Sequence, residues 1–269
     1  MTFTTKLNVA QEKTSSVVCV GLDPIPDRLP EHMRGLPVEE AVTRFCASII
    51  EATVPVACAY KPNLAFFEAL GRSGLSVLAD VVAAIPNDRI IIADGKRGDI
   101  GSSAERYAEA AFETLGCDAC TVSAYMGREA MAPFLQHEDK AAFALVRTSN
   151  PGADEIQELD IEGRPLYMRV AEMAAGLGQE TAGSVGFVVG ATRPGVLASI
   201  RAAFPLTPLL IPGIGAQGGD PHQVALASNV GKSPVMVNAS RSIIYAGSGA
   251  DYADRAFEAA NAMRKQLIP

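Results

Sequence analysis

The sequence contains no tryptophan, and it has only three histidines among 269 residues. His32, His137 and His222 are scattered along the chain, and no histidine lies near a cysteine pair at the spacing of a zinc site. The sequence therefore indicates no metal cluster.

Long apolar runs and basic blocks are also missing. No apolar run approaches the roughly 20 residues needed to span a bilayer, and the first 16 residues, MTFTTKLNVAQEKTSS, lack the apolar stretch and cleavage site of a signal peptide. The net charge is −7 and there is no block rich in lysine and arginine, which is a poor electrostatic match for nucleic acid or an anionic membrane. We expect a cytoplasmic protein that binds neither.

The five cysteines lie mostly inside apolar segments, which is typical of reduced thiols in a protein core. Cys117 and Cys120 have the spacing of a redox motif. They precede a strand-like segment, however, and do not open a helix, where a thiolate would be stabilised. We predict buried structural cysteines.

Short apolar runs rich in β-branched residues recur along the whole chain. Their nearly continuous apolar character is typical of parallel strands that are covered on both faces. The eight runs span residues 17–23, 56–63, 89–96, 118–125, 141–150, 184–192, 207–215 and 234–242.

Helical patterns lie between these runs. Apolar residues from Val42 to Ile50 follow the spacing of one helix face, and residues 101–115, 166–177, 195–204 and 252–267 are rich in alanine with interspersed charges. Eight βα units predict an α/β fold, a closed (β/α)8 TIM barrel. It would form a single domain over residues 1–269, with strands at about 17–242 and a C-terminal helix at about 252–267. An open doubly wound sheet is the alternative.

Polar residues follow most of the predicted strands. Catalytic groups of such barrels lie where the strands end and the βα loops begin. Seven of the eight runs end in polar residues, and the fourth, near Tyr125, is less polar. The polar ends are Asp23, Lys61 with Asn63, Asp94 with Lys96, Ser149 with Asn150, Thr192 with Arg193, Gln217, and Arg241.

The third run, IIIADGKRGD, ends in a group of charges. Asp94 and Lys96 are two apart on a strand and should point to the same face; Lys61 ends the neighbouring strand, and Asp99 lies where the loop could fold back or reach another subunit. Buried charges are tolerated when they are paired, so we predict an array of alternating sign in which Lys61, Asp94, Lys96 and Asp99 are paired throughout. An ammonium between carboxylates suits proton donation to a carbanion, and a fixed carboxylate would repel a substrate carboxylate.

The segment GIGAQG, residues 213–218, matches the dinucleotide-binding pattern G-x-G-x-x-G. Its context differs, because it follows the seventh strand and no acidic residue occurs between Asp220 and Asp251 to hold an adenosine ribose. We interpret it as a loop whose backbone N–H groups bind a phosphate, with Arg241 after the eighth strand as a bidentate partner. A tight turn beside a surface arginine is the alternative.

Six motifs in this order resemble the orotidine 5′-phosphate decarboxylase family, in its longer bacterial, type 2 branch. They are GLDP, KPN, DGKRGDI, TSNPGA, PGIGAQGGD and SRSI, between residues 17 and 245. The resemblance implies decarboxylation of orotidine 5′-phosphate to UMP and CO2, the last step of de novo pyrimidine synthesis. It also implies a homodimer with shared active sites that works without a metal or organic cofactor.

The resemblance also implies roles for single residues. Lys61, Asp94, Lys96 and Asp99 match the family's catalytic charge network, in which Lys96 is the proton donor and Asp99 comes from the partner subunit. Among the substrate-binding positions, Asp23 matches a ligand of a ribose hydroxyl, Ser149 binds the pyrimidine ring, Pro212 opens the phosphate-loop motif, and Gln217 and Arg241 bind the phosphate. Ile100 and Ser103 match residues supplied by the partner subunit around the ring and ribose; Ser103 stands where threonine is expected.

Two other functions remain open at this point. Metal-dependent sugar-phosphate decarboxylases and aldol-type enzymes share the Asp-x-Lys-x-x-Asp element. Their resemblance implies a metal site with an acidic residue at the position of Lys61. A lysine at that position repels Mg²⁺ and argues against them. A non-catalytic nucleotide-binding barrel would not need the charge network.

Overall fold

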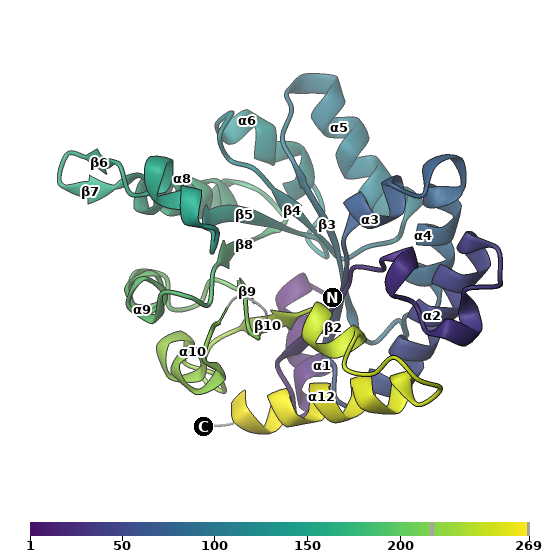
Figure 1. Ribbon diagram of the computed structural model, residues 1–269. Helices are drawn as coiled ribbons and strands as arrows, with labels where there is room; N and C mark the ends of the chain where they lie inside the picture. Colours follow the sequence, from purple (N-terminus) through teal and green to yellow (C-terminus); the bar gives the residue numbers. More distant parts are fainter. Residues whose placement is uncertain (216–217, 268–269) are drawn as a thin grey trace.

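Eight parallel strands close into a barrel, and helices cover its outside (Figure 1). The computed structural model describes residues 1–215 and 218–267. The barrel strands, in chain order, are β1 (Val18–Leu22), β2 (Ala59–Pro62), β3 (Ile90–Arg97), β4 (Ala119–Val122), β5 (Ala141–Arg147), β8 (Ser184–Val189), β9 (Leu209–Pro212) and β10 (Val235–Ala239). The first and last pair in parallel, with Val18 opposite Val237, so the predicted closed (β/α)8 barrel is confirmed and the open sheet is wrong.

The expected helices are present. The longer ones are α2 (Val38–Thr53), α4 (Gly74–Ala83), α5 (Gly101–Glu109), α8 (Leu166–Glu180), α9 (Pro194–Ala203), α10 (Pro221–Ser228) and α12 (Tyr252–Leu267). A π-helical turn, Ala110–Thr114, continues α5. Shorter helices are α3 (Leu64–Glu68), α6 (Arg128–Met131), α7 (Asp154–Gln157) and α11 (Arg241–Ile244). None of the helices in the described ranges is long and apolar enough to cross a membrane.

Strand alternation divides the side chains between two layers. Ile90 and Ile92 pack inside the barrel, whereas Ile91 and Ala93 belong to the core between the strands and the helices. The inner positions continue upward two residues at a time, so the next inner residue on β3 is Asp94. The pattern that builds the core therefore also brings polar groups to the carboxyl end of the barrel.

A helix at the start of the chain, α1 (Phe3–Thr14), was not expected from the sequence. Phe3, Leu7 and Ala10 are fully buried against the barrel interior, and the Phe3 ring lies 5.8 Å from that of Phe143. The side-chain amide of Gln11 donates to the carbonyl of Val235, the first residue of β10. Helix α1 therefore covers the amino ends of the strands, at the opposite end from the polar residues.

The segment between β5 and α8 projects from the barrel (Figure 1). It contains α7 and a two-stranded antiparallel hairpin, β6 (Asp160–Ile161) with β7 (Arg164–Pro165). The fully buried side chain at the end of β5, Arg147, donates from Nε to Glu158 at 2.8 Å and also pairs with Asp154. These ion pairs hold the segment between β5 and α8 against the end of β5.

All five cysteines are free and buried, as predicted. Burial raises the pKa of Cys19 and of Cys117 to about 12. These thiols are therefore neutral at physiological pH and behave as small apolar side chains.

Candidate active site

Three charged side chains from β2 and β3 meet at the carboxyl end of the barrel. Lys61 Nζ lies 2.5 Å from Asp94 Oδ2, and Lys96 Nζ lies 2.7 Å from Asp94 Oδ1. The two strands are neighbours, and Asn63 forms a backbone bridge with Asp94. The predicted convergence of Lys61, Asp94 and Lys96 is therefore present, with one carboxylate between two ammonium groups.

The three groups differ in their exposure. Lys61 and Asp94 are only 5% and 6% exposed, whereas the side chain of Lys96 is 51% exposed. Burial alone would raise the pKa of Asp94, but the charges of Lys61 and Lys96 outweigh it and hold that pKa well below its usual range. Burial alone would lower the pKa of Lys61, but the charges of Asp94 and Asp23 outweigh it, and the pKa is raised. Both buried groups are thus charged at neutral pH, and Lys96 is the accessible cation.

The backbone at Lys96 departs from a regular strand. Its φ is +47°, in the left-handed region, and the pairing of β3 with β4 shifts register between Ala93 and Arg97. Strand alternation therefore explains why Asp94 points inward. The expectation that Lys96 shares this face by the same alternation is wrong, because the strand is irregular at Lys96. The ammonium reaches Asp94 because the chain bends there. Arg97 then points away and pairs with Glu68 on α3.

A residue that we did not single out from the sequence completes the cluster. Thr121 on β4 is 1% exposed; its hydroxyl donates to Asp94 Oδ1 at 3.0 Å and accepts from the backbone N–H of Lys96 at 2.9 Å. Strand alternation could have found it, because Thr121 is two residues beyond Ala119, which packs inside the barrel. The end of β4 is therefore polar on its inner face.

Asp99 does not join the cluster among the described residues of one chain, so the pairing of this fourth member with the array stays a prediction. The carboxylate accepts a hydrogen bond from the backbone N–H of Ile100 at 2.8 Å, and it makes no ion pair within the described residues. Ile100 and Ser103 at the start of α5 are exposed. All three residues lie on one surface loop and the first turn of its helix.

Asp23 follows β1 on the same rim of the barrel. Its Oδ1 atom is buried and has no hydrogen-bond partner among the described residues. Together with Asp94, its negative charge raises the pKa of Lys61 against the effect of burial. An unpartnered buried carboxylate oxygen is costly, so this atom is suited to accept a hydrogen bond from a ligand.

The glycine-rich loop begins at the end of β9, where Pro212 is the last strand residue. Gly213, Gly215 and Gly218 have φ values of 107°, 81° and 85°, which only glycine adopts readily. A Cβ atom on Gly215 would lie 2.9 Å from the Ser242 hydroxyl, so the loop packs directly against α11. Gln217 lies outside the described residues.

Arg241 is the first residue of α11 and is exposed. It forms no ion pair with a carboxylate in the part of the chain that the structure describes. Its neighbour Ser242 packs against Gly215, so Arg241 begins its helix next to the glycine loop.

Ser149 follows β5 and is partly buried. A Cβ atom on Gly190 would come within 2.8 Å of its Cβ, so the end of β8 approaches it closely. The ion pairs of Arg147, two residues earlier, hold the chain that continues from Ser149. Ser149 thus lies on the barrel rim between β5 and β8.

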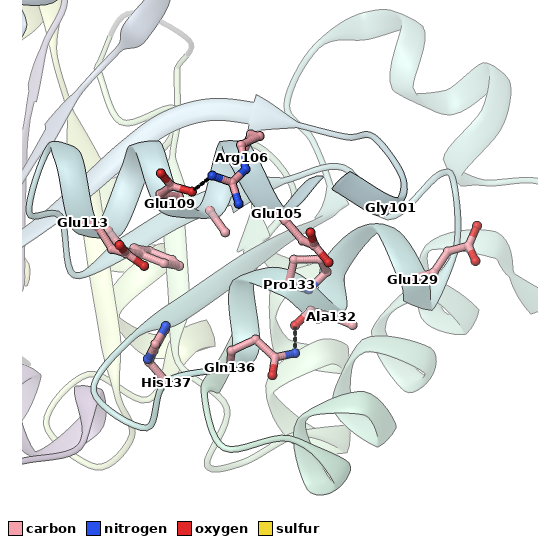
Figure 2. Close-up of a pocket in the computed structure, with 12 residues that line it drawn as sticks. Gly101, Glu105, Arg106, Glu109, Glu113, Glu129, Ala132, Pro133, Gln136 and His137 are labelled. Atoms are coloured by element: carbon pink, nitrogen blue, oxygen red, sulfur yellow. Dashed lines mark hydrogen bonds and ion pairs between the residues drawn. The ribbon is translucent and has the colours of Figure 1, made fainter. Parts of the chain in front are cut away.

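A separate groove of about 680 Å³ lies on the outside of the barrel, between α5 and the segment 128–137 (Figure 2). Its labelled acidic side chains are Glu105, Glu109, Glu113 and Glu129, and Arg106 is paired with Glu109. A phosphate ester would be repelled there, so we place the active site at the barrel rim. Within residues 1–215 and 218–267, no three histidine, cysteine or acidic side chains are grouped to hold a metal ion.

Comparisons with known proteins agree with the fold and identify the family. Residues 16–256 match the family model described as orotidine 5′-phosphate decarboxylase / HUMPS family. The chain is 48% identical to orotidine 5′-phosphate decarboxylase of Roseiflexus castenholzii and 45% identical to that of Herpetosiphon aurantiacus, covering 99% of this chain and 97% of each relative. The structure of Leishmania donovani OMP decarboxylase superposes with a TM-score of 0.83 at 38% identity, over 98% of this chain and 99% of the other. The chain belongs to the orotidine 5′-phosphate decarboxylase / HUMPS family.

Proposed function

We infer that this protein is a carboxy-lyase that converts orotidine 5′-phosphate to UMP and CO2, the last step of pyrimidine biosynthesis. Its full-length relatives are named for this activity. The observation that carries the inference is the buried Asp94 between Lys61 and Lys96 at the barrel rim. That arrangement places a fixed negative charge beside an accessible proton donor.

The rim residues suggest how the substrate lies. We assign the phosphate to the glycine loop, from Pro212 through Gln217, and to Arg241, because backbone N–H groups and a guanidinium both suit a dianion. The free Oδ1 of Asp23 would accept a ribose hydroxyl. Ser149 would then contact the pyrimidine, and C6 with its carboxylate would face Asp94 and Lys96.

In this position the reaction needs one proton from the protein. The bond from C6 to the carboxylate breaks, CO2 leaves, and the electron pair remains on C6. Lys96 transfers a proton from its ammonium group to C6, which gives UMP, and the neutral amine then takes a proton from solvent. Lys61 keeps Asp94 ionised through both steps, because its buried charge remains paired with that carboxylate.

Magnitudes indicate which effect dominates. Repulsion between Asp94 and a substrate carboxylate at about 4 Å is worth about 4 kcal/mol at an effective dielectric constant of 20, whereas demanding enzymes lower their barriers by up to about 23 kcal/mol. Relief of repulsion is therefore a minor share. The larger share must come from Lys96 and fixed dipoles that stabilise the carbanion, together with phosphate binding that drives closure of loops over the site. The segment after Pro151 is a candidate for such a loop, and the predicted second candidate, after Gly215, begins with residues that lie outside the described ones.

We further propose a homodimer in which Asp99, Ile100 and Ser103 complete the site of the partner subunit. Asp99 has no cationic partner among the residues that the structure describes, and Ile100 is 47% exposed although it is apolar. Both features would be explained if this loop packed into a second copy. Each site would then contain four charges of alternating sign.

Direct assay of the purified protein tests the proposed reaction. We expect CO2 release and UMP formation from orotidine 5′-phosphate, with no loss of rate in excess chelator, because the proposed chemistry uses protein side chains. Loss of the activity with chelator and recovery with Mg²⁺ would favour the metal-dependent sugar-phosphate enzymes instead. Tight UMP binding without any turnover would favour a non-catalytic barrel.

Replacing Arg241 with alanine should separate phosphate binding from chemistry. We expect kcat/KM for orotidine 5′-phosphate to fall about 100- to 1000-fold, because a charge-assisted bidentate contact is lost. Activity on orotidine, which has no phosphate, should change less than about threefold. Arg72→Ala, at an exposed arginine in the turn between α3 and α4, is the control and should match the parent on both substrates. Equal losses on both substrates would remove Arg241 from the phosphate site.

A further inference from the structure

We propose that Thr121 is a positioning residue for decarboxylation, whose hydroxyl fixes the Asp94 carboxylate and the Lys96 backbone relative to each other. The proposal rests on the proposed function and adds a residue from β4 to it. It concerns a group that does not touch the substrate and acts through the two residues that do.

The hydrogen bonds of Thr121 have a defined direction. A hydroxyl has one proton to donate and two lone pairs that accept. The ionised Asp94 carboxylate can only accept, and the Lys96 backbone N–H can only donate. The hydroxyl therefore donates to Asp94 Oδ1 at 3.0 Å and accepts from Lys96 at 2.9 Å, and neither direction can be reversed.

Lys96 needs this partner because its backbone is unusual. The left-handed region is unfavourable for a residue with a side chain, and Lys96 has a φ of +47°. The ladder between β3 and β4 pairs Ala93 with Cys120 and resumes only at Arg97 with Val122. Between these points the Lys96 N–H donates to the threonine side chain instead, which offsets part of the strain.

Hydrogen bonds and an ion pair connect Lys96, Asp94 and Thr121 in a closed cycle. Lys96 is held at its backbone by Thr121 and at its ammonium by Asp94, while Asp94 is held by Lys61, Lys96 and Thr121 together. Without the hydroxyl, the Lys96 backbone can relax toward ordinary strand angles. That relaxation moves the ammonium, which is the half-exposed group of the cluster.

A displacement of this kind should appear in kcat. Misplacing a catalytic group by about 1 Å can cost about 100-fold in rate. Binding of the phosphate and ribose should change little, because Thr121 lies on β4, away from the glycine loop and α11. A split between kcat and KM is therefore the expected signature of a positioning role.

The experiment compares Thr121→Val with Thr121→Ser. Valine keeps the shape of the side chain without the hydroxyl, and we expect kcat to fall about 30- to 100-fold with KM within about threefold of the parent. Serine keeps the donor and acceptor and should retain kcat within about threefold. Thr53→Val is the matched control: Thr53 is also fully buried, and its hydroxyl bonds to Ile49 in α2 and to Tyr60 on the helix-facing side of β2. It should keep the parental kcat.

Three results would overturn the proposal. They are a parental kcat in Thr121→Val, a serine variant as impaired as the valine variant, and an equal loss of kcat in the Thr53→Val control. If Thr121→Val does not fold, Thr121→Ala provides the same comparison with serine. Activity of the parent protein on orotidine 5′-phosphate is measured alongside, so failure of the proposed function is seen separately from failure of the role of Thr121.

Discussion

Replacing Lys96 with alanine should lower kcat for orotidine 5′-phosphate by at least about 10⁴-fold, the upper range for general acid catalysis. The ammonium is the proton donor of the proposed reaction, and in that reaction it would also be an accessible positive charge beside the developing carbanion. Both contributions disappear together. Asp94 remains ionised in the variant, because Lys61 and Thr121 still hold it, and the substrate carboxylate then faces that charge without compensation.

Substrate binding should survive in this variant. UMP is the better ligand for the measurement, since it carries no carboxylate that Asp94 could repel. We expect its dissociation constant, measured by calorimetry, to stay within about tenfold of the parental value, because the phosphate contacts are untouched. Loss of turnover with retained UMP affinity would assign Lys96 to the chemical step.

Lys13 offers a matched control. It is an exposed lysine that pairs with one aspartate, Asp88, far from the barrel rim. Lys13→Ala should keep the parental kcat and dissociation constant. A Lys96→Ala variant with kcat within tenfold of the parent would remove Lys96 from the chemistry and leave another proton donor to be found.

The barrel could be predicted from the sequence because the same pattern, an apolar run followed by a helical segment, is repeated along the chain. Eight apolar runs at suitable spacing leave few alternatives, and the inner and outer layers follow from strand alternation. The same rule places Lys61 and Asp94 correctly, since both continue the inner face of a regular strand. Their pairing follows from burial, because an isolated charge is not tolerated there.

The features that the sequence did not predict depend on departures from regular strand geometry or on the assembled barrel. The bend at Lys96 and the register shift beside it are not coded by periodicity, and Thr121 is a single hydroxyl in an otherwise apolar strand. Helix α1 has its buried residues three and four apart, but its burial depends on the open amino end of a barrel that is formed by the rest of the chain. Local sequence could not show that this end needs a cover.

In the proposed homodimer, Asp99 acts in the site of a second chain. Within residues 1–215 and 218–267 of its own chain, its partner is a backbone N–H and no cation pairs with it. A carboxylate that completes a neighbour's charge network predicts complementation between two inactive variants. We expect Asp99→Ala and Lys96→Ala homodimers each to be inactive, whereas a heterodimer with one chain of each kind should recover about half of the parental activity per dimer, since one of its two sites is intact.

The arithmetic of the heterodimer makes this outcome specific. If Asp99 crosses the interface, one site receives parental Lys96 from the Asp99→Ala chain and parental Asp99 from the Lys96→Ala chain. If Asp99 acts in its own chain, every site carries one defect, and the heterodimer stays as inactive as its parents. The heterodimer can be isolated with a different affinity tag on each chain, and a heterodimer of two differently tagged Lys96→Ala chains is the control that should stay inactive. A purified heterodimer without recovered turnover would return Asp99 to its own subunit, and an active Asp99→Ala homodimer would show that the charge network works with three members.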